Sequence, residues 1–333
     1  MRILSFKTMI IIKNKSFDPY FNLAAEEYFI KNTKEPMIML WRNGPAVIVG
    51  VNQNTAAEVN REYCEENGIA VVRRLTGGGA VFHDKGNINY TYIEKNDSTK
   101  FSNYSLFTKD IIDYLKTLGL CATLSGRNDV LIGEKKIMGN AQCVKCGNIM
   151  HHGCILYSAD LSRLSKALNV SRAKIESKGI KSVSSRVVNI SDCLKQNLST
   201  DDFLKGLECF LEKRYNCKAR ELSPLEKEKI EAIKSEKYLL FDWNFGSSPD
   251  YSFEKSEKFP FGIVSVRFNV HSGVITDLKI EGDFFGSEDI HVLEEKIKGT
   301  KHSSSSLEAV LKGVPTDLFI KGCKSSDLIK LFL

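Results

Sequence analysis

The feature that most constrains this sequence is the uneven distribution of its prolines. Pro19, Pro36 and Pro45 are followed by no further proline until Pro224. Because proline interrupts helices and central strands, an interval of this length predicts one continuous, densely structured unit. The chain of 333 residues is also long enough for about two domains.

A segment rich in Gly, Ser, Pro and charged residues marks the predicted boundary between these domains. This composition is typical of a linker. We therefore expect a large domain over residues 1–245, a linker over 246–261 and a small domain over 262–333. Residues 1–245 carry a net charge of +8 and the remaining residues a net charge of −2. The large domain should therefore attract anions, and the small domain should not.

The composition is that of a globular protein, with 42% hydrophobic and 26% charged residues, and it excludes a disordered, collagen-like or disulfide-scaffold chain. The apolar run Met9–Ile12 ends at Lys13, so neither a signal peptide nor a membrane span is expected there. The nine cysteines follow no repeating framework, which is typical of thiols in a reducing compartment. We expect a soluble, cytoplasmic protein without structural disulfides that binds neither membranes nor nucleic acid.

Hydrophobic periodicity predicts a mixture of short helices and strands. In the large domain the predicted helices cover 21–31, 56–67, 104–118, 158–168, 200–214 and 224–234, and the strands cover 37–42, 46–51, 69–73, 87–93, 130–132, 136–138 and 153–156. In the small domain we expect a hairpin of 263–270 and 274–280 and helices at 288–298, 304–312 and 326–332. Strand 87–93 alternates apolar and polar residues, the pattern of a half-buried strand. Strands outnumber βαβ units, which favours the α+β class with a mixed, largely antiparallel sheet and flanking helices.

Three consecutive glycines lie between two apolar runs in the stretch Arg73–Asp84 (RRLTGGGAVFHD). Glycine permits close approach of the backbone, and the two arginines that precede the glycines add positive charge, a combination that suits a phosphate cradle. The stretch is not a P-loop, which needs Gly-Lys-Ser/Thr, and Phe82 replaces the last glycine of a dinucleotide fingerprint. Taken alone, it is better interpreted as a tight glycine corner between strands.

A second polar stretch, Gly126–Gln142, places Asn128 and Asp129 before an apolar strand and Lys136 on the return strand. A lysine beside Gly139 on a short strand can direct its ammonium group into a cleft. The alternative is an exposed hairpin lysine, which is the commoner environment for a lysine.

Two adjacent histidines, His151 and His152, lie on a further predicted strand. Adjacent strand residues face opposite sides, so at most one histidine can face a given site and the other is expected to be structural.

Cys143 and Cys146 form a CxxC pair near these histidines and Cys154. Because no second pair follows at zinc-finger spacing, a zinc site is the minority interpretation.

Taken together, these stretches resemble the lipoate-protein ligase A family. The matching segments occur in family order at 17–27, 40–43, 50–54, 73–87, 126–142, 151–153, 159–164 and 178–187. Two residues depart from the family pattern, because Met138 stands where many relatives have Ser and Cys154 where they have Thr. Neither departure removes a charge.

The resemblance implies a biotin/lipoate ligase-like large domain, a small α+β accessory domain and a two-step reaction. Lipoate and Mg²⁺-ATP would give lipoyl-adenylate and pyrophosphate. The adenylate would then acylate a lysine of the lipoyl domain of a 2-oxoacid dehydrogenase E2 subunit or of the glycine-cleavage H protein. We expect the enzyme to act as a monomer.

The resemblance also implies roles for individual residues. Lys136 is the expected catalytic residue, because an ammonium between a carboxylate and the α-phosphate stabilises the adenylation transition state. The residues implied for ATP are Arg74, Gly79, Ala80, Val81, Phe82, Asn128, Asp129 and Lys136. The residues implied for lipoate are Arg74, Thr76, Gly78, Lys136 and His152. Lys178, Ser182, Ser185 and Arg186 would belong to a loop that covers the adenylate. Mg²⁺ would arrive with ATP, and Asp129 is the protein ligand to consider.

Two other functions are weighed against the ligase. An octanoyl or lipoyl transferase would use a cysteine thioester, but such relatives carry their nucleophile in the segment that here is Gly126–Asp129, and Cys121 and Cys154 lie elsewhere. A non-catalytic lipoate-binding protein could dispense with Lys136 or Arg74, and both are present. The biotin ligases' Gly-Arg-Gly-Arg loop is absent. The ATP-dependent ligase is therefore favoured.

Overall fold

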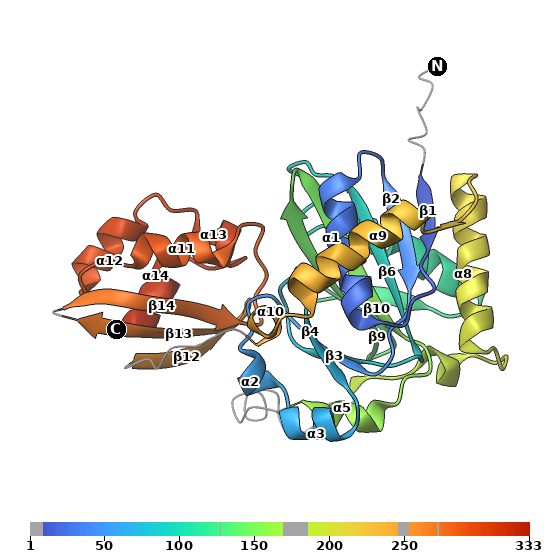
Figure 1. The fold of residues 1–333 in the computed structure, drawn as a ribbon, viewed down its shortest axis with the longest axis horizontal. Coiled ribbons are helices and arrows are strands. Elements are labelled where there is room, and N and C mark those ends of the chain that lie inside the picture. The colour runs from blue at the N-terminus through green and yellow to red at the C-terminus, as the bar shows by residue number, and fades with distance from the viewer. Residues whose placement is uncertain (1–8, 127, 169–185, 246–252, 272) are drawn as a thin grey trace, which may run out of the picture.

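An eight-stranded sheet forms the centre of the large domain (Figure 1). The computed structural model describes residues 9–126, 128–168, 186–245, 253–271 and 273–333. The strands run in the order β11 (Arg220–Glu221), β1 (Ile10–Lys13), β2 (Met37–Trp41), β6 (Asn87–Lys95), β10 (Asn148–Leu156), β9 (Lys135–Lys145), β8 (Asp129–Ile132) and β7 (Ala122–Ser125). Among the described residues, the only parallel pairs in this sheet are β1 with β2 and β1 with β11. The expected mixed, largely antiparallel sheet is therefore confirmed.

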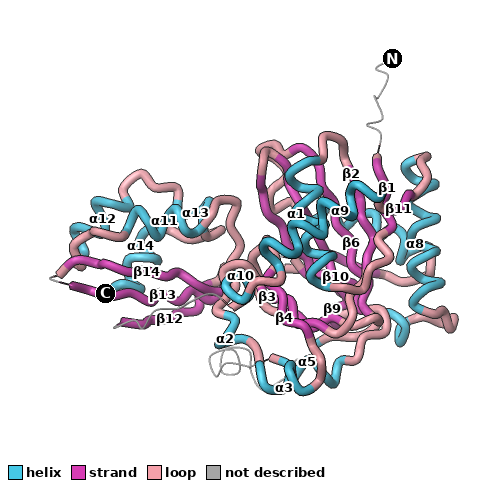
Figure 2. Tube along the Cα trace, in the orientation of Figure 1, coloured by secondary structure: helices cyan, strands magenta, loops and turns pink. Residues whose placement is uncertain are grey.

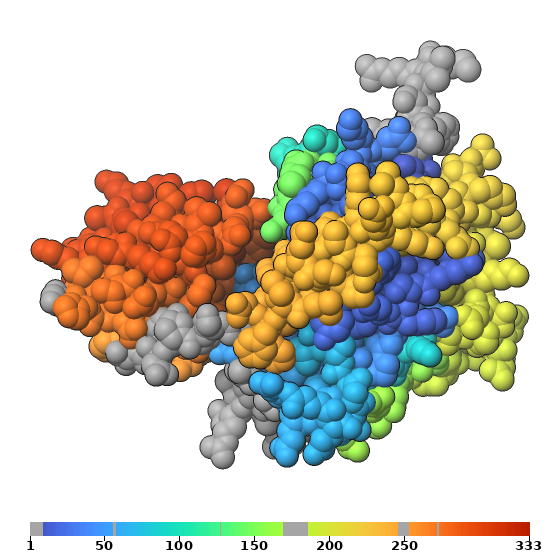
Figure 3. Space-filling view, viewed as in Figure 1, coloured from blue at the N-terminus to red at the C-terminus, as the bar shows by residue number. Residues whose placement is uncertain are grey.

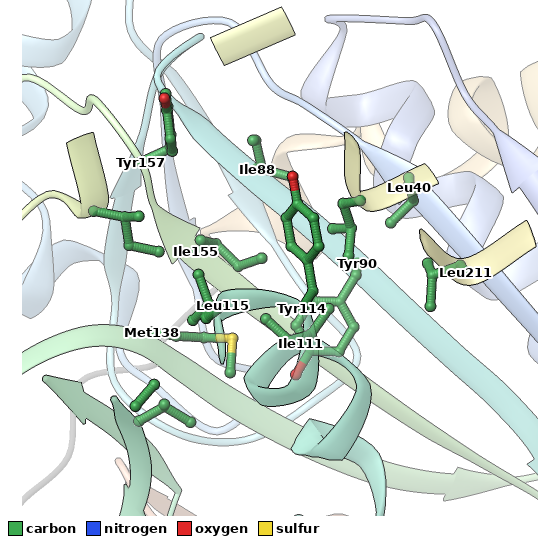
Figure 4. Packing of buried hydrophobic residues seen from close by; sticks show 14 of the residues in the cluster. Leu40, Ile88, Tyr90, Ile111, Tyr114, Leu115, Met138, Ile155, Tyr157 and Leu211 are labelled. Carbon is green, nitrogen blue, oxygen red and sulfur yellow. The ribbon is translucent and has the colours of Figure 1, made fainter. Parts of the chain in front are cut away.

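The two faces of this sheet are covered differently. One face packs on α4 (Tyr104–Thr117) and α8 (Thr200–Tyr215), and Figure 4 shows part of the apolar cluster that fills this layer. The other face packs on α1 (Pro19–Asn32) and on a second sheet of order β4 (Ala70–Arg73), β3 (Ala46–Val49) and β5 (Val81–His83). The large domain is therefore layered, with an apolar cluster packed between the two sheets.

Strand β6 is buried on both sides, so the prediction of a half-buried strand was wrong. Ile88, Tyr90 and Tyr92 belong to the core beneath α4. The polar residues between them, Asn89 and Thr91, are also at most 1% exposed, because the second sheet and α1 cover that face. Polar residues with this degree of burial require hydrogen-bond partners or a ligand.

The remaining elements of the large domain surround this core. They are α2 (Thr55–Glu58), α3 (Arg61–Glu66), α5 (Leu161–Ala167), η1 (Ile190–Cys193), α9 (Pro224–Ile233), η2 (Lys234–Tyr238) and α10 (Phe241–Asn244). The helix expected over 56–67 is interrupted, because the Asn60 side chain accepts a hydrogen bond from the Tyr63 N–H and starts α3 anew. None of the helices in the described ranges is long and apolar enough to cross a membrane.

The small domain contains a three-stranded antiparallel sheet of order β12 (Phe253–Phe259), β13 (Gly262–His271) and β14 (Val274–Gly282) (Figure 2). Four helices follow, α11 (Ile290–Ile297), α12 (Ser304–Leu311), α13 (Thr316–Phe319) and α14 (Ser325–Phe332). The predicted hairpin and the three predicted helices are confirmed.

The predicted linker over 246–261 was wrong from residue 253 onward. Phe253 to Phe259 pair with β13 as an edge strand, and the Phe253 ring stacks on Phe268 with centroids 5.2 Å apart. This strand is rich in charged and exposed residues because it lies at the sheet edge, so its composition imitates that of a linker. Residues 246–252 lie outside the described residues.

Glu27 is a buried carboxylate that connects α1 to η2. Figure 3 shows the band of α9 and η2 crossing α1. The Glu27 oxygens accept hydrogen bonds from Lys237 Nζ at 2.7 Å and Tyr238 Oη at 2.9 Å, and Lys31 Nζ lies 2.6 Å away. Burial alone would raise the pKa of Glu27, but the bonds from Lys237 and Lys31 outweigh it, so this pKa is lowered.

We expect the substitution Glu27→Gln to reduce the free energy of unfolding at pH 7 by about 2 kcal/mol, since it leaves two cations without their shared anion. A carboxylate with a lowered pKa stabilises the fold above its unfolded pKa, and this contribution disappears as the pH falls through the folded pKa. Urea denaturation should therefore give a difference from the wild type that shrinks between about pH 5 and pH 3. The exposed Glu35→Gln is the control. An equally small effect of both substitutions would contradict this prediction.

Candidate active site

The predicted site residues converge on the face of the large sheet that is directed toward the second sheet. On this face His152 of β10 is paired with Thr91 of β6, and Cys154 is paired with Asn89. The glycine-rich stretch lies opposite, between β4 and β5 of the second sheet. The β-sheet pairing therefore brings together segments that are far apart in the sequence.

Arg74 holds the glycine-rich stretch in shape. The residue is 6% exposed. Its guanidinium donates hydrogen bonds to the carbonyl oxygens of Ile48 at 3.1 Å, Gly77 at 2.6 Å and Gly79 at 3.0 Å, and to Thr76 Oγ1 at 2.9 Å. Burial lowers the pKa of Arg74 to about 10, so the side chain stays charged at neutral pH. Arg74 therefore stabilises the conformation of the loop at which ATP is expected to bind.

Arg73 is also occupied by the protein itself. It donates to the carbonyl oxygens of Gly50, Val51 and Gln53 at 2.6 to 3.0 Å, and to that of Trp243 at 2.9 Å. Burial lowers its pKa to about 10. Both arginines are therefore buried and hold the surrounding loops in place through hydrogen bonds. The sequence pattern alone did not distinguish this arrangement from a pair of exposed arginines.

A continuous hydrogen-bonded chain runs from Thr76 into the sheet. His152 Nε2 lies 2.8 Å from Thr76 Oγ1, and His152 Nδ1 lies 2.9 Å from Glu26 Oε1. The carboxylate can only accept, so Nδ1 carries a proton and donates it to Glu26. Thr91 Oγ1 also donates to Glu26 Oε1, at 2.6 Å, and receives the Trp41 indole N–H at 2.8 Å. Glu26 orients His152, and sequence reasoning did not single it out.

His151 lies on the opposite face of β10, as expected for the structural member of the pair. Its ring stacks on Phe107 with centroids 5.0 Å apart, and its two nitrogens contact Gln142 Nε2 at 3.0 Å and Tyr90 Oη at 3.2 Å. Burial holds the pKa of His151 well below its usual value, so the ring is neutral.

Lys136 lies at the open end of this face. Its Nζ is 2.7 Å from Asp129 Oδ1, and the side chain is 32% exposed. The side chain lies over Gly139, where an added Cβ would be 2.8 Å from Nζ, so any larger residue there would displace the ammonium group. Lys136 therefore presents a cation that an incoming anion could take from Asp129.

The segment expected to cover the adenylate is described only at its end. Lys178, Ser182 and Ser185 lie outside the described residues. The described part begins at Arg186, and Val187 forms a parallel bridge with Lys136. The expected loop therefore rejoins the large domain beside the predicted catalytic lysine.

Asn128 joins two strands at this end. Its Nδ2 donates to the Asn140 carbonyl at 2.6 Å, and Asn140 Nδ2 donates to the Asn128 carbonyl at 2.9 Å. These bonds position the start of β8, where Asp129 pairs with Gly139. A contact of the Asn128 side chain with ATP stays a prediction.

The cysteines of the described residues form no metal cluster, and burial disfavours the thiolate of Cys154, which lies on the face of the candidate site. Cys143 is buried in the core beneath α1, whereas Cys146 is exposed in the β9–β10 turn with φ +52°. No group of three or more His, Cys, Asp and Glu in the described ranges could hold a metal ion. Burial raises the pKa of Cys154 to about 12, against the opposing effects of Asn87 and Lys136.

The small domain contacts the glycine-rich stretch. The Gly78 N–H donates to the Phe284 carbonyl at 3.2 Å, and Gly78 has φ +93°, which favours glycine. The Gly282 N–H donates to the Asn52 carbonyl at 2.6 Å. Figure 1 shows this end of β14 meeting the large domain near α10. The segment after β14 is thus part of the site's surroundings, which the sequence analysis did not anticipate.

Three buried side-chain nitrogens in this region have no hydrogen-bond partner among the described residues. They are Gln53 Nε2, His83 Nε2 and Asn89 Nδ2. Unpaired buried donors are rare in folded proteins and require an acceptor from outside the chain, either ordered water or a ligand.

Comparison with known proteins covers both domains. The family model of the lipoyl protein ligase A/B catalytic domain matches residues 18–212, and that of the bacterial lipoate protein ligase C-terminus matches residues 248–332. The lipoate-protein ligase LplJ of Bacillus subtilis is 40% identical over 97% of this chain and 99% of its own length. Lipoate–protein ligase 1 of Staphylococcus aureus is 39% identical over 96% of this chain and 98% of its own length.

Solved structures agree with this result. LipL1 of P. falciparum in complex with lipoate has a TM-score of 0.76 and 27% identity, and the match covers 92% of this chain and 94% of that chain. A bipartite lipoate protein ligase from Thermoplasma acidophilum, studied with its E2 lipoyl domain, has a TM-score of 0.64 and 28% identity over 74% and 100% of the two chains. Lipoate-protein ligase A bound with ATP has a TM-score of 0.61 and 26% identity over 72% and 98%.

Proposed function

The chain belongs to the lipoate-protein ligase family, and from this premise we propose which of its residues carry the ATP-dependent attachment of lipoate to a protein lysine. The observation that supports the proposal most directly is the position of Lys136. Its ammonium lies at the open end of the face that also carries His152 and Cys154, within 2.7 Å of Asp129.

In the first step, one carboxylate oxygen of lipoate attacks the α-phosphorus of ATP. A carbon–oxygen–phosphorus linkage forms, the bond to the β-phosphate breaks, and pyrophosphate leaves with the electron pair. Both reactants are anions, so the step needs positive charge at the reaction centre. Lys136 supplies this charge, and the backbone from Gly79 to Phe82 binds the nucleotide.

In the second step, the neutral amine of the acceptor lysine attacks the carbonyl carbon of lipoyl-adenylate. A carbon–nitrogen bond forms, the bond to AMP breaks, and the amine proton passes to solvent. Without adenylation the carboxylate is too poor an electrophile for this attack.

The lipoate chain lies against the apolar residues between the two sheets. Trp41, Ile48 and Leu75 belong to this cluster, and Thr76 and His152 form a polar contact beside it. Arg74 contributes by holding Thr76 and the glycines in place.

Mg²⁺ would accompany the triphosphate. The described residues do not form a cluster that could bind the ion on their own, and Asp129 is engaged by Lys136. Asp129 would become available as one ligand once Lys136 turns to the phosphate.

The proposed acceptors are lipoyl domains of 2-oxoacid dehydrogenase E2 subunits and the glycine-cleavage H protein. The similarity to a ligase studied with its E2 lipoyl domain supports the first of these. We further propose a monomeric enzyme, because one chain supplies all the site residues, and a cytoplasmic location, because all nine cysteines are unpaired.

The direct test is incubation of the enzyme with lipoate and an apo-lipoyl domain, with and without ATP. The mass of the lipoyl domain should increase by one lipoyl group only with ATP. An unchanged lipoyl domain together with tight lipoate binding would instead support a non-catalytic lipoate-binding protein.

A further inference from the structure

Buried Asn14, Asn22, Asn43 and His83 form a hydrogen-bonded chain that ends in the space between the two sheets. Asn14 Nδ2 donates to Asn22 Oδ1 at 2.9 Å, and Asn22 Nδ2 donates to Asn43 Oδ1 at 2.8 Å. Asn43 Nδ2 then contacts His83 Nδ1 at 3.1 Å. All four residues are at most 6% exposed.

Backbone groups fix the direction of this chain. The Ser16 N–H can only donate, and it donates to Asn14 Oδ1 at 3.1 Å, so the Asn14 amide nitrogen must face Asn22. The carbonyls of Ser16 and Arg42 can only accept, and both lie within 3.0 Å of Asn22 Nδ2. The nitrogen end of Asn22 is therefore fixed, and Asn43 must accept from it with its oxygen.

The tautomer of His83 follows from this direction. Because the Asn43 oxygen faces Asn22, its NH₂ group donates to His83 Nδ1. In a neutral imidazole the proton then lies on Nε2. Burial, together with the charges of Arg74 and His152, lowers the pKa of His83 to about 3, so the ring is neutral at physiological pH.

The Nε2–H group of His83 is the buried donor that has no partner among the described residues. The ring follows the stretch Gly79–Phe82 directly on β5, and its centroid is 6.5 Å from that of Trp41. Trp41 is paired on the large sheet with Asn89, whose Nδ2 is a second unpartnered buried donor. Two neutral donors, one from each of the two facing sheets, therefore lie beside the proposed lipoate site.

We propose that His83 is a further catalytic residue, which donates its Nε2–H to the lipoate carboxylate oxygen that becomes the carbonyl oxygen of the adenylate. Asn14, Asn22 and Asn43 are positioning residues that keep Nδ1 an acceptor and Nε2 a donor. This inference rests on the proposed function.

The neutrality of this donor suits the chemistry. The oxygen that His83 binds is partly negative in the carboxylate, nearly neutral in the adenylate and negative again when the lysine amine attacks the carbonyl carbon. A preorganised donor in a buried site stabilises the oxyanion that forms when the amine attacks. Because the donor is neutral, it binds the uncharged carbonyl oxygen of the product less strongly than a cation would. Lys136 remains available for the phosphate and the bridging oxygen.

The test compares His83→Gln with His83→Leu. The glutamine amide nitrogen can replace Nε2 as a donor, whereas leucine cannot donate. We expect His83→Leu to lower kcat for adenylation and for lysine acylation from supplied lipoyl-adenylate by about 10²-fold each, and to raise the KM for lipoate. His83→Gln should recover most of this loss, and His291→Leu, an exposed histidine of α11, should behave as the wild type.

Two further measurements separate catalysis from packing. Calorimetry should show that His83→Leu weakens binding of lipoate but not of the corresponding primary alcohol, which has no carboxylate. Nitrogen-15 spectra of labelled histidine should show His83 protonated on Nε2 alone in the wild type. In Asn43→Asp the new carboxylate would accept a proton from Nδ1 and reverse that assignment.

Equal impairment by glutamine and leucine, a raised KM for ATP in place of lipoate, or an Nδ1–H tautomer in the wild type would each overturn the inference. An inactive wild-type enzyme would contradict the proposed function itself. A wild type that is active beside a fully active His83→Leu variant would contradict only the role of His83.

Discussion

Replacement of Lys136 with alanine is expected to lower the rate of lipoyl-adenylate formation by about 10² to 10³-fold while the fold remains intact. Lys136 is 32% exposed and its ammonium contacts Asp129, so its removal leaves no cavity in the core. The loss should arise because two anions must then approach each other without the cation between them. Pyrophosphate release with saturating lipoate and ATP measures this rate directly.

The neighbouring Lys135 supplies a matched control, because it is an exposed lysine on the same strand. Lys135→Ala should retain the wild-type rate, and both variants should unfold at the wild-type urea concentration. Lys136→Arg keeps the charge but changes its geometry, so its loss should be milder. Near-normal pyrophosphate release by Lys136→Ala would remove this lysine from the mechanism.

The second large effect concerns ATP, without which no transfer to a lipoyl domain should be detectable. After reaction with lipoate and ATP, the denatured enzyme should keep its unmodified mass and release acyl-adenylate. Burial raises the pKa of Cys154 to about 12, so its thiolate fraction at pH 7 is about 10⁻⁵. A thiol held in this state is a poor nucleophile, and we expect the acyl group to be carried as a non-covalent mixed anhydride.

Cysteine variants make this prediction specific. Cys154→Thr and Cys121→Ser should each keep activity within a few-fold of the wild type. A stable mass increase of one acyl group on either cysteine, or transfer from an acyl-carrier protein without ATP, would place the enzyme among the thioester-forming transferases.

The sequence predicted which candidate residues lie together best where those residues are close in the chain. Lys136, Asp129 and Gly139 lie within one hairpin, so their spacing alone brings them together. The adjacent histidines are a similar case, because strand alternation required His151 and His152 to face opposite sides. The alternation did not reveal which histidine faces the site, and contacts with Thr76 and Glu26 decide this.

The sequence misled where burial depends on what covers a segment. Strand β12 has the charged composition of a linker because one of its edges is exposed to solvent. Strand β6 has the alternating pattern of a half-buried strand, although a second sheet covers its polar face. The CxxC pair invites a zinc interpretation, but Cys143 lies in the core and Cys146 in an exposed turn. Each of these sequence patterns occurs both in the predicted environment and in the one that the structure shows.

The sequence by itself determined most of the helices and strands and the family, and it predicts Lys136 as the reactive lysine. These properties follow from hydrophobic periodicity and from motifs that are contiguous in the chain. The tertiary structure alone decided that both arginines are loop scaffolds, that Glu26 orients His152 and that three asparagines direct the His83 proton. The physical reason is that hydrogen bonds are short and directional, so a bond between residues that are distant in the sequence exists only after the sheets have brought them together.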